Sequence, residues 1–102
     1  MSVLSSDPYY RTLNISITPT AVDEILEGTP IAWDGTNTKY AKFDTGLTPV
    51  GIALRAVPST SASPLAILVQ GRVDRKVVEA AFGASLTEAQ IVAYCNNGIV
   101  IA

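Results

Sequence analysis

Apolar and polar residues alternate through the first predicted element, which runs from residue 9 to residue 18. Leu13, Ile15 and Ile17 are separated by polar side chains, so they would lie on one face of a β-strand. Pro19 ends the pattern, because proline lacks the backbone donor that a strand ladder uses. The pattern predicts a strand with one apolar face, preceded by an unpacked stretch over residues 1–8.

Six further segments have the composition of strands, and turn residues separate them. Asp34-Gly35 lies between two of these segments and is a strong hairpin signal. Val50, Ile52 and Leu54 alternate with other residues and are expected to face one way. Segment 65–69 is continuously apolar, which indicates a strand buried on both faces. The predicted strands are 21–26 (where one helical turn is the alternative), 31–33, 39–43, 50–54, 65–69 and 99–101, with a polar loop over 58–64.

The last third of the chain changes to a helical spacing. Apolar residues at 77, 78, 81 and 82 would form one face of a short helix that ends near Gly83. Segment 87–90, Thr-Glu-Ala-Gln, is a capping-box pattern, and Ser85 with Glu88 is a competing pair. It predicts a second helix, ended by Asn97-Gly98, with an apolar stripe of Ile91, Val92, Tyr94 and Cys95. Together these elements predict an α+β fold: short strands in a small barrel-like or sandwich-like core, with one or two short helices.

Composition narrows the class of protein. The chain has 102 residues, which favours one domain, and 16% of them are charged, against roughly 25% in an average soluble domain. So few charges favour a surface that is partly covered by association. The net charge of −2 and the lack of a basic stripe argue against a nucleic-acid partner. No apolar run is long enough to span a bilayer, and residues 1–11 do not have the pattern of a secretory leader.

Candidate chemistry is sparse. The chain has no histidine, which removes the commonest general base and zinc ligand. Its one cysteine, Cys95, is expected to be a buried structural residue, and a single cysteine fits synthesis in a reducing compartment. Asp23, Glu24 and Glu27 are expected to be a solvated acidic turn, since known metal loops need more oxygen ligands at fixed spacing. We therefore expect no catalytic, cofactor or metal site.

Two side-chain groups leave alternatives open. Arg72, Arg75 and Lys76 could meet an acidic partner surface, or simply form a solvated rim. The aromatic residues Trp33, Tyr40 and Phe43 could line a groove for a sugar or peptide, or belong to the core. A small β-rich ligand-binding module is thus one hypothesis, and an enzyme subunit completed by a partner chain is another.

Several segments, taken in order, resemble the head decoration proteins of lambda-like tailed phages. Segment 31–36, Ile-Ala-Trp-Asp-Gly-Thr, is similar to that family's Val-Ala-Trp-Asp-Gly-Thr, and segment 50–54, Val-Gly-Ile-Ala-Leu, to its Val-Gly-Ile-Leu-Ala. A Ser/Thr-rich loop, an apolar strand, Gly71-Arg72 and the ending Gly98-Ile99-Val100-Ile101 follow in the family's order. The resemblance covers residues 25–102. The segment between Gly35 and Val50 is longer than in the family, and the N-terminal arm matches poorly.

The resemblance implies a capsid decoration protein that binds the outside of the expanded head and stabilises it against packaged DNA. It implies a homotrimer at local threefold sites, with the phage's major capsid protein as partner and no cofactor. The protein would be made in the host cytoplasm and carried on the virion surface. A flexible capsid-binding arm would span residues 1–18 and a single β-rich domain residues 19–102, so deleting 1–18 should abolish capsid binding and leave the remainder folded. Candidate capsid-binding residues are Tyr9, Tyr10, Leu13, Ile15 and Ile17, and candidate trimer contacts are Leu65, Ile67 and Val69.

Overall fold

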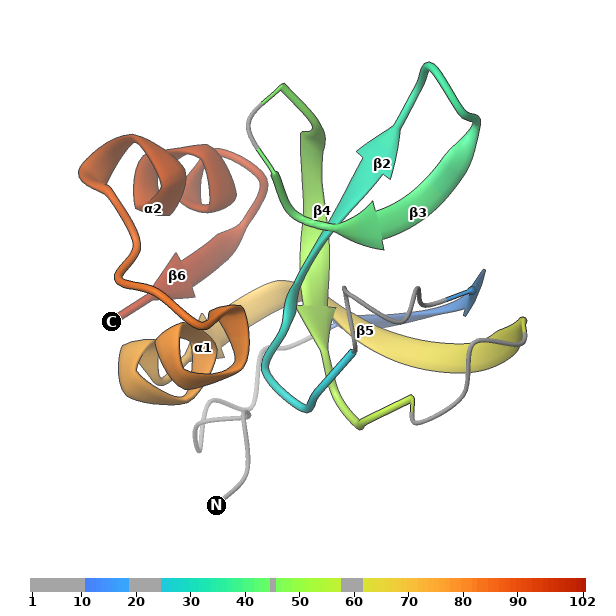
Figure 1. Cartoon of the computed structure of the whole chain (residues 1–102). Coiled ribbons are helices and arrows are strands. Elements are labelled where there is room, and N and C mark those ends of the chain that lie inside the picture. Colours follow the sequence, from blue (N-terminus) through green and yellow to red (C-terminus); the bar gives the residue numbers. More distant parts are fainter. Residues whose placement is uncertain (1–10, 19–24, 45, 58–61) are drawn as a thin grey trace.

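The structure, a computed structural model, describes residues 11–18, 25–44, 46–57 and 62–102. It confirms the predicted α+β class, with a six-stranded sheet and two short helices (Figure 1). The strands are β1 (Arg11–Ile17), β2 (Pro30–Asp34), β3 (Lys39–Lys42), β4 (Thr48–Ala53), β5 (Ser63–Val73) and β6 (Ile99–Ile101). The helices are α1 (Arg75–Phe82) and α2 (Glu88–Cys95). Most of predicted segment 21–26 lies outside the described residues, and the polar loop expected up to Pro64 ends before β5 begins at Ser63.

The sheet is a curled half-barrel. Its strand order is β1-β5-β4-β2-β3, and each neighbouring pair in this order is antiparallel. β6 pairs in parallel with the far end of β5, beyond the part that β1 covers. The curl brings β1 and β3, the two ends of the order, close to each other. Both helices lie with β6 at one side of the molecule, and the β2–β3 hairpin extends away from them (Figure 1).

Strand β5 is the spine of the fold. It pairs with β1 along residues 63–70, with β4 at Ile67 and Leu68, and with β6 along residues 71–73. Ile67 packs into the core cluster inside the curl, whereas Leu68 packs into the second cluster beneath the helices. The predicted burial of this strand on both faces is therefore confirmed.

A β-bulge at Val50 corrects one sequence prediction. Ile31 lies opposite Gly51 and Ala32 lies opposite Pro49, so Val50 has no partner of its own on β2. An extra residue in one strand shifts the alternation of side chains that follows it. Val50 consequently packs against the cluster inside the curl, while Ile52 and Leu54 join the cluster beneath the helices. The expectation that Val50, Ile52 and Leu54 face one way was wrong for Val50.

The two helices begin and end at residues with clear capping roles. Asp74 caps α1 by accepting a hydrogen bond from the Lys76 backbone N–H. Gly83 ends α1 at φ 84°, a left-handed conformation that glycine adopts at little cost. Helix α2 has the predicted capping box: Thr87 Oγ1 accepts from the Gln90 N–H, and Gln90 Oε1 accepts from the Thr87 N–H. Thr87, and not the competing Ser85, is therefore the N-cap.

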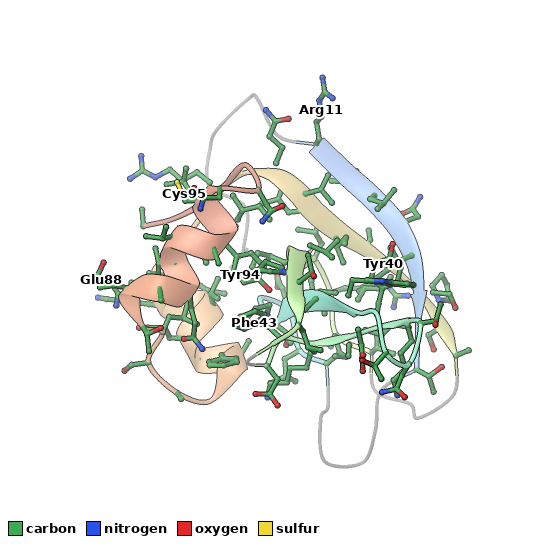
Figure 2. The ribbon with its side chains drawn as sticks, turned by 90° about the horizontal axis from the view of Figure 1, so that it is seen from above. Arg11, Tyr40, Phe43, Glu88, Tyr94 and Cys95 are labelled. Carbon is green, nitrogen blue, oxygen red and sulfur yellow. The ribbon has the colours of Figure 1, made fainter. Side chains whose placement is uncertain are left out.

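The apolar stripe predicted for α2 is only half correct. Tyr94 is fully buried and Ile91 packs against the same cluster, and these two residues lie three apart on the inner face. Val92 is 51% exposed and Cys95 is exposed, because both point about 100° away from that inner face. Figure 2 shows Cys95 on the outer side of the helix and Tyr94 directed toward the centre of the molecule.

Tyr94 connects helix α2 to the centre of the sheet. Its buried hydroxyl donates a 2.8 Å hydrogen bond to the Ile31 carbonyl on β2, and its ring lies edge-on to Phe43 at 5.4 Å between centroids. Burial raises the pKa of Tyr94 well above its usual range, so the hydroxyl stays protonated and remains a donor.

Replacing Tyr94 by phenylalanine is expected to lower the free energy of unfolding by about 1–2 kcal/mol, because the ring packing remains and only the buried hydrogen bond is lost. Urea unfolding followed by circular dichroism measures this difference. Tyr40→Phe is the matched control, since the Tyr40 hydroxyl makes no hydrogen bond within the described part of the chain. Equal losses in the two variants would contradict a special contribution from the Tyr94 hydroxyl.

Candidate functional site

The predicted capsid-binding residues fall into three structural situations. Tyr9 and Tyr10 lie outside the described residues. Ile15 and Ile17 are buried members of the core cluster inside the curl. Leu13 is 45% exposed near the start of β1, and is the only described member of the set with a large accessible apolar surface.

Residues 11–17 of the expected arm belong to the sheet. Strand β1 pairs with β5 along its whole length, with Ile15 opposite Leu65 and Leu13 opposite Ile67. The predicted strand is thus confirmed over residues 11–17, and its Ile15 and Ile17 belong to the core. Residues 11–17 of the expected arm are therefore not free to dock elsewhere in this structure.

The predicted trimer contacts are mostly internal. Leu65 and Ile67 are 1% and 0% exposed, and both pack within the cluster inside the curl. Val69 is only partly buried, at the edge of the same cluster. The continuous apolar character that drew attention to this strand reflects its two buried faces, so Leu65 and Ile67 have no free surface to offer to a second copy.

The aromatic residues do not form a single face. Trp33 and Tyr40 are opposite each other on β2 and β3, with an edge-on contact of 4.9 Å between ring centroids. Phe43 lies on the other side and contacts Phe82 at 6.5 Å and Tyr94 at 5.4 Å. Tyr40 and Phe43 are three residues apart, and side chains at odd separations point to opposite faces of a strand. Figure 2 shows this division, with Phe43 near Tyr94 and Tyr40 away from α2.

Two adjoining hollows follow the outer edge of β3, where the curl brings β1 close. One has a volume of about 420 Å³ and the other about 310 Å³, and Ile17, Thr18, Lys39 and Tyr40 line both. Lys42 also lines the larger hollow, and its Nζ lies 5.7 Å from the centre of the Phe82 ring. This edge groove combines aromatic rings with two lysines, Lys39 and Lys42, and two aspartates, Asp34 and Asp44, so its lining suits a small ligand with an apolar body and polar groups and does not favour one sign of charge.

The Asp34 side chain makes its hydrogen bonds within its own turn. Asp34 Oδ1 accepts hydrogen bonds from the backbone N–H groups of Thr36 and Asn37, and Oδ2 accepts from the Asn37 side-chain amide at 2.8 Å. These bonds hold the pKa of the Asp34 carboxyl below its usual range, with the Asn37 amide as the largest cause. Both carboxylate oxygens serve the turn, which supports a hairpin role for this segment.

The basic residues Arg72, Arg75 and Lys76 do not act as a cluster. Arg75 pairs with Glu79 at 3.2 Å, and Glu79 accepts a 2.7 Å hydrogen bond from the Leu86 N–H. Arg75 also donates to the Leu86 carbonyl at 3.4 Å. These contacts attach the α1–α2 connection to helix α1. Arg72 lies opposite Val100 on the β5–β6 pair, with its side chain exposed.

The Glu79 contacts predict a pH dependence. The Leu86 N–H first, and then Arg75, hold the pKa of the Glu79 carboxyl below its usual value of 4.5. A lowered pKa in the folded state adds stability at neutral pH, which is lost as the pH falls from about 4.5 through the folded pKa. Thermal unfolding of wild type and Glu79→Gln should therefore differ most at neutral pH and converge in acid. A constant difference across this range would contradict the role of the carboxylate charge.

Cys95 and the acidic residues of the described chain do not form a metal-binding group. Cys95 is exposed at the end of α2, so the expectation of a buried structural cysteine was wrong: it lies on the outer face of a helix only eight residues long. In the described part of the chain no group of three or more His, Cys, Asp or Glu side chains is placed to hold a metal ion. Among the same residues, no helix is long and apolar enough to cross a membrane.

No protein-family model matches this chain, and no curated protein matches it at a significant level. Trp33, Tyr40 and Phe43, for which a groove was one of the two alternatives, all line the edge groove, Phe43 in the larger hollow and Trp33 in the smaller one. The opposite wall of the groove, Ile17 and Thr18, could not be predicted because it depends on β1 approaching β3, two strands that are distant in the sequence. The exposed Leu13 was grouped with its buried neighbours because alternation predicts which face a residue is on, but not where the covering core ends.

Proposed function

We propose that this protein decorates a phage capsid: it binds the major capsid protein on the outside of the expanded head, as a homotrimer at local threefold sites, and stabilises the shell against packaged DNA. The observation that carries the proposal is the ordered set of family-like segments together with their places in the fold. Segment 31–36 covers β2 and its turn, 50–54 lies on β4, 71–72 ends β5, and 98–101 forms β6. These strands are neighbours in the order β2-β4-β5-β6, so the resemblance follows one continuous part of the sheet.

Exposed apolar side chains lie on several elements of the described chain, which fits a protein with several neighbours, although single exposed apolar residues are also common on monomers. Among the residues that the structure describes, four large apolar ones are exposed: Leu13 on β1, Leu26 before β2, Val92 on α2 and Val100 on β6. They lie on different segments of the described chain. A decoration protein contacts both its own copies and the shell, so it needs apolar surface on more than one side.

The chain that precedes β1 supplies the proposed attachment. Strand β1 begins at Arg11, directly after residues 1–10 in the sequence, and Leu13 offers an exposed apolar contact near the start of this strand. An extended arm that adds a strand to a neighbour's sheet gains affinity from backbone hydrogen bonds, and pays an ordering entropy on docking. Three arms on one trimer would make the second and third contacts intramolecular, which raises avidity.

Co-sedimentation with shells of the protein's own phage tests the proposal. We expect the purified full chain to sediment with expanded shells at about one copy per capsid subunit, and to stay in solution with immature shells. Expanded shells with bound protein should also withstand heating better than bare shells. Failure to bind expanded shells would overturn the proposal.

The edge groove supports a second candidate, a small-ligand-binding module. Trp33 and Tyr40 line one end of this groove, and Lys42 with Phe82 lines the other. A ligand bound there would alter the fluorescence of Trp33, the chain's only tryptophan. Screening small aromatic compounds with polar groups by this signal, with Lys42→Ala as the control variant, distinguishes the two functions, since shell binding should not depend on Lys42.

A further inference from the structure

The turn between α2 and β6 places an asparagine directly before a glycine. Asn97 is exposed, and its side-chain amide donates a 2.9 Å hydrogen bond to the Ala93 carbonyl in the last turn of α2. The Gly98 N–H donates to the Cys95 carbonyl at 3.0 Å, and Gly98 has a positive φ of 91°. The Gly98 carbonyl accepts from the Gly71 N–H on β5 at 3.0 Å. This short turn therefore attaches β6 to the spine of the sheet.

An Asn–Gly pair can undergo spontaneous deamidation through a cyclic imide. The backbone nitrogen of the glycine attacks the side-chain amide carbon of the asparagine. This attack is easier before glycine than before other residues, because glycine has no Cβ to obstruct the approach. A bond forms between Gly98 N and Asn97 Cγ, the bond from Cγ to Nδ2 breaks, and ammonia leaves with the proton from Gly98 N. Water then opens the resulting five-membered imide at either carbonyl, which gives aspartate or isoaspartate.

We infer that Asn97 is a site of spontaneous deamidation whose rate is set by opening of the α2–β6 turn. In the folded chain both reacting groups are engaged: Asn97 Nδ2 with the Ala93 carbonyl, and Gly98 N with the Cys95 carbonyl. The attack needs both bonds to break, because the amide must rotate toward Gly98 and the nitrogen must lose its proton. Both bonds lie at an exposed helix end, where local opening costs far less free energy than global unfolding.

The product would weaken the turn that it forms in. A carboxylate at position 97 has no proton to donate to the Ala93 carbonyl, and it places negative charge at the C-terminal end of α2, where the helix dipole disfavours it. Isoaspartate also lengthens the backbone by one carbon and would displace the Gly98 carbonyl from the Gly71 N–H. Deamidation therefore loosens the attachment of β6 to β5.

Incubating the full chain at mildly alkaline pH, with and without guanidinium chloride, tests this inference. Peptide mass spectrometry follows the conversion of each asparagine over time. We expect Asn97 to convert readily in denaturant and about tenfold more slowly in the folded chain, because two hydrogen bonds must open first. Asn37, which precedes Thr38, and Asn96, which precedes Asn97, are internal controls that should convert far more slowly than Asn97 in denaturant.

Two variants separate the chemistry from its consequence. Asn97→Gln retains an amide donor but would need a less favourable six-membered ring, so it should remain unmodified in denaturant. Asn97→Asp mimics one product and should lower the melting temperature by roughly 4 °C in a domain of this size. No conversion of Asn97 in denaturant would overturn the site, and equal rates in the folded and denatured chains would overturn control by the turn.

Discussion

Deleting residues 1–18 is expected to unfold this chain, whereas deleting residues 1–10 should leave it folded. The longer deletion removes β1, and with it Ile15 and Ile17 from the core. It also exposes Leu65 and Ile67 on β5, which β1 covers. Truncating a single buried isoleucine costs about 2–5 kcal/mol, and domains of this size have about 5–15 kcal/mol in total. Loss of the whole strand should therefore remove most of the free energy of unfolding.

Circular dichroism and thermal unfolding of the two truncated chains measure this difference, and the shell-binding assay gives it functional meaning. The chain without residues 1–10 should unfold cooperatively but no longer sediment with expanded shells, if the arm provides attachment. Its normal binding would overturn the arm mechanism and leave the fold untouched. A folded chain without residues 1–18 would instead contradict the role of β1 in the core.

The substitution Gly51→Ala is expected to destabilise the protein by about 3 kcal/mol, at the upper end for overpacked sites. A Cβ on Gly51 would lie 2.5 Å from the Leu68 carbonyl oxygen and 3.0 Å from the Ile67 Cδ1 atom. The oxygen belongs to the backbone of β5, so relief requires β4 and β5 to move apart. Because Gly51 is next to the bulge at Val50, such a movement would also disturb the pairing of β4 with β2.

The matched control for this substitution is Gly35→Ala. A Cβ on Gly35 would meet only the Trp33 Nε1 atom at 3.8 Å, which is an ordinary contact. Gly35 also has no positive φ, so alanine fits its backbone. Urea unfolding should show a large loss for Gly51→Ala and a change within about 0.5 kcal/mol for Gly35→Ala. Similar midpoints for Gly51→Ala and wild type would show that the two strands can separate at little cost.

Local patterns were sufficient for most of the elements. Alternation predicted β1, the Asp34 turn predicted the β2–β3 hairpin, and the capping box at Thr87 placed the start of α2. The bulge at Val50 escaped prediction because it depends on how β4 aligns with β2, and no local signal in 50–54 marks it. The requirement for glycine at position 51 likewise comes from the carbonyl of Leu68, a residue distant in the sequence.

The candidate sites were harder to predict than the fold. An apolar residue looks the same in the sequence whether its side chain packs in the core or lies on the surface where a partner could bind. Leu13 and Ile15 lie two residues apart on one face, yet only Ile15 is buried by the residues around it. Tyr94 and Cys95 are adjacent on a short helix and point about 100° apart, so the orientation of the helix on the sheet decides which of the two is buried. Such distinctions require the tertiary arrangement.

Strand direction along the curled sheet has a consequence for closure of the barrel. Directions alternate at each step of the order β1-β5-β4-β2-β3, so its two end strands, β1 and β3, run the same way. An odd number of alternating strands cannot close into a ring that is antiparallel throughout. Among the described strands, parity therefore excludes antiparallel pairing between β1 and β3, which lie close together but do not pair. Complete closure would need parallel pairing at this seam, or one more strand of opposite direction.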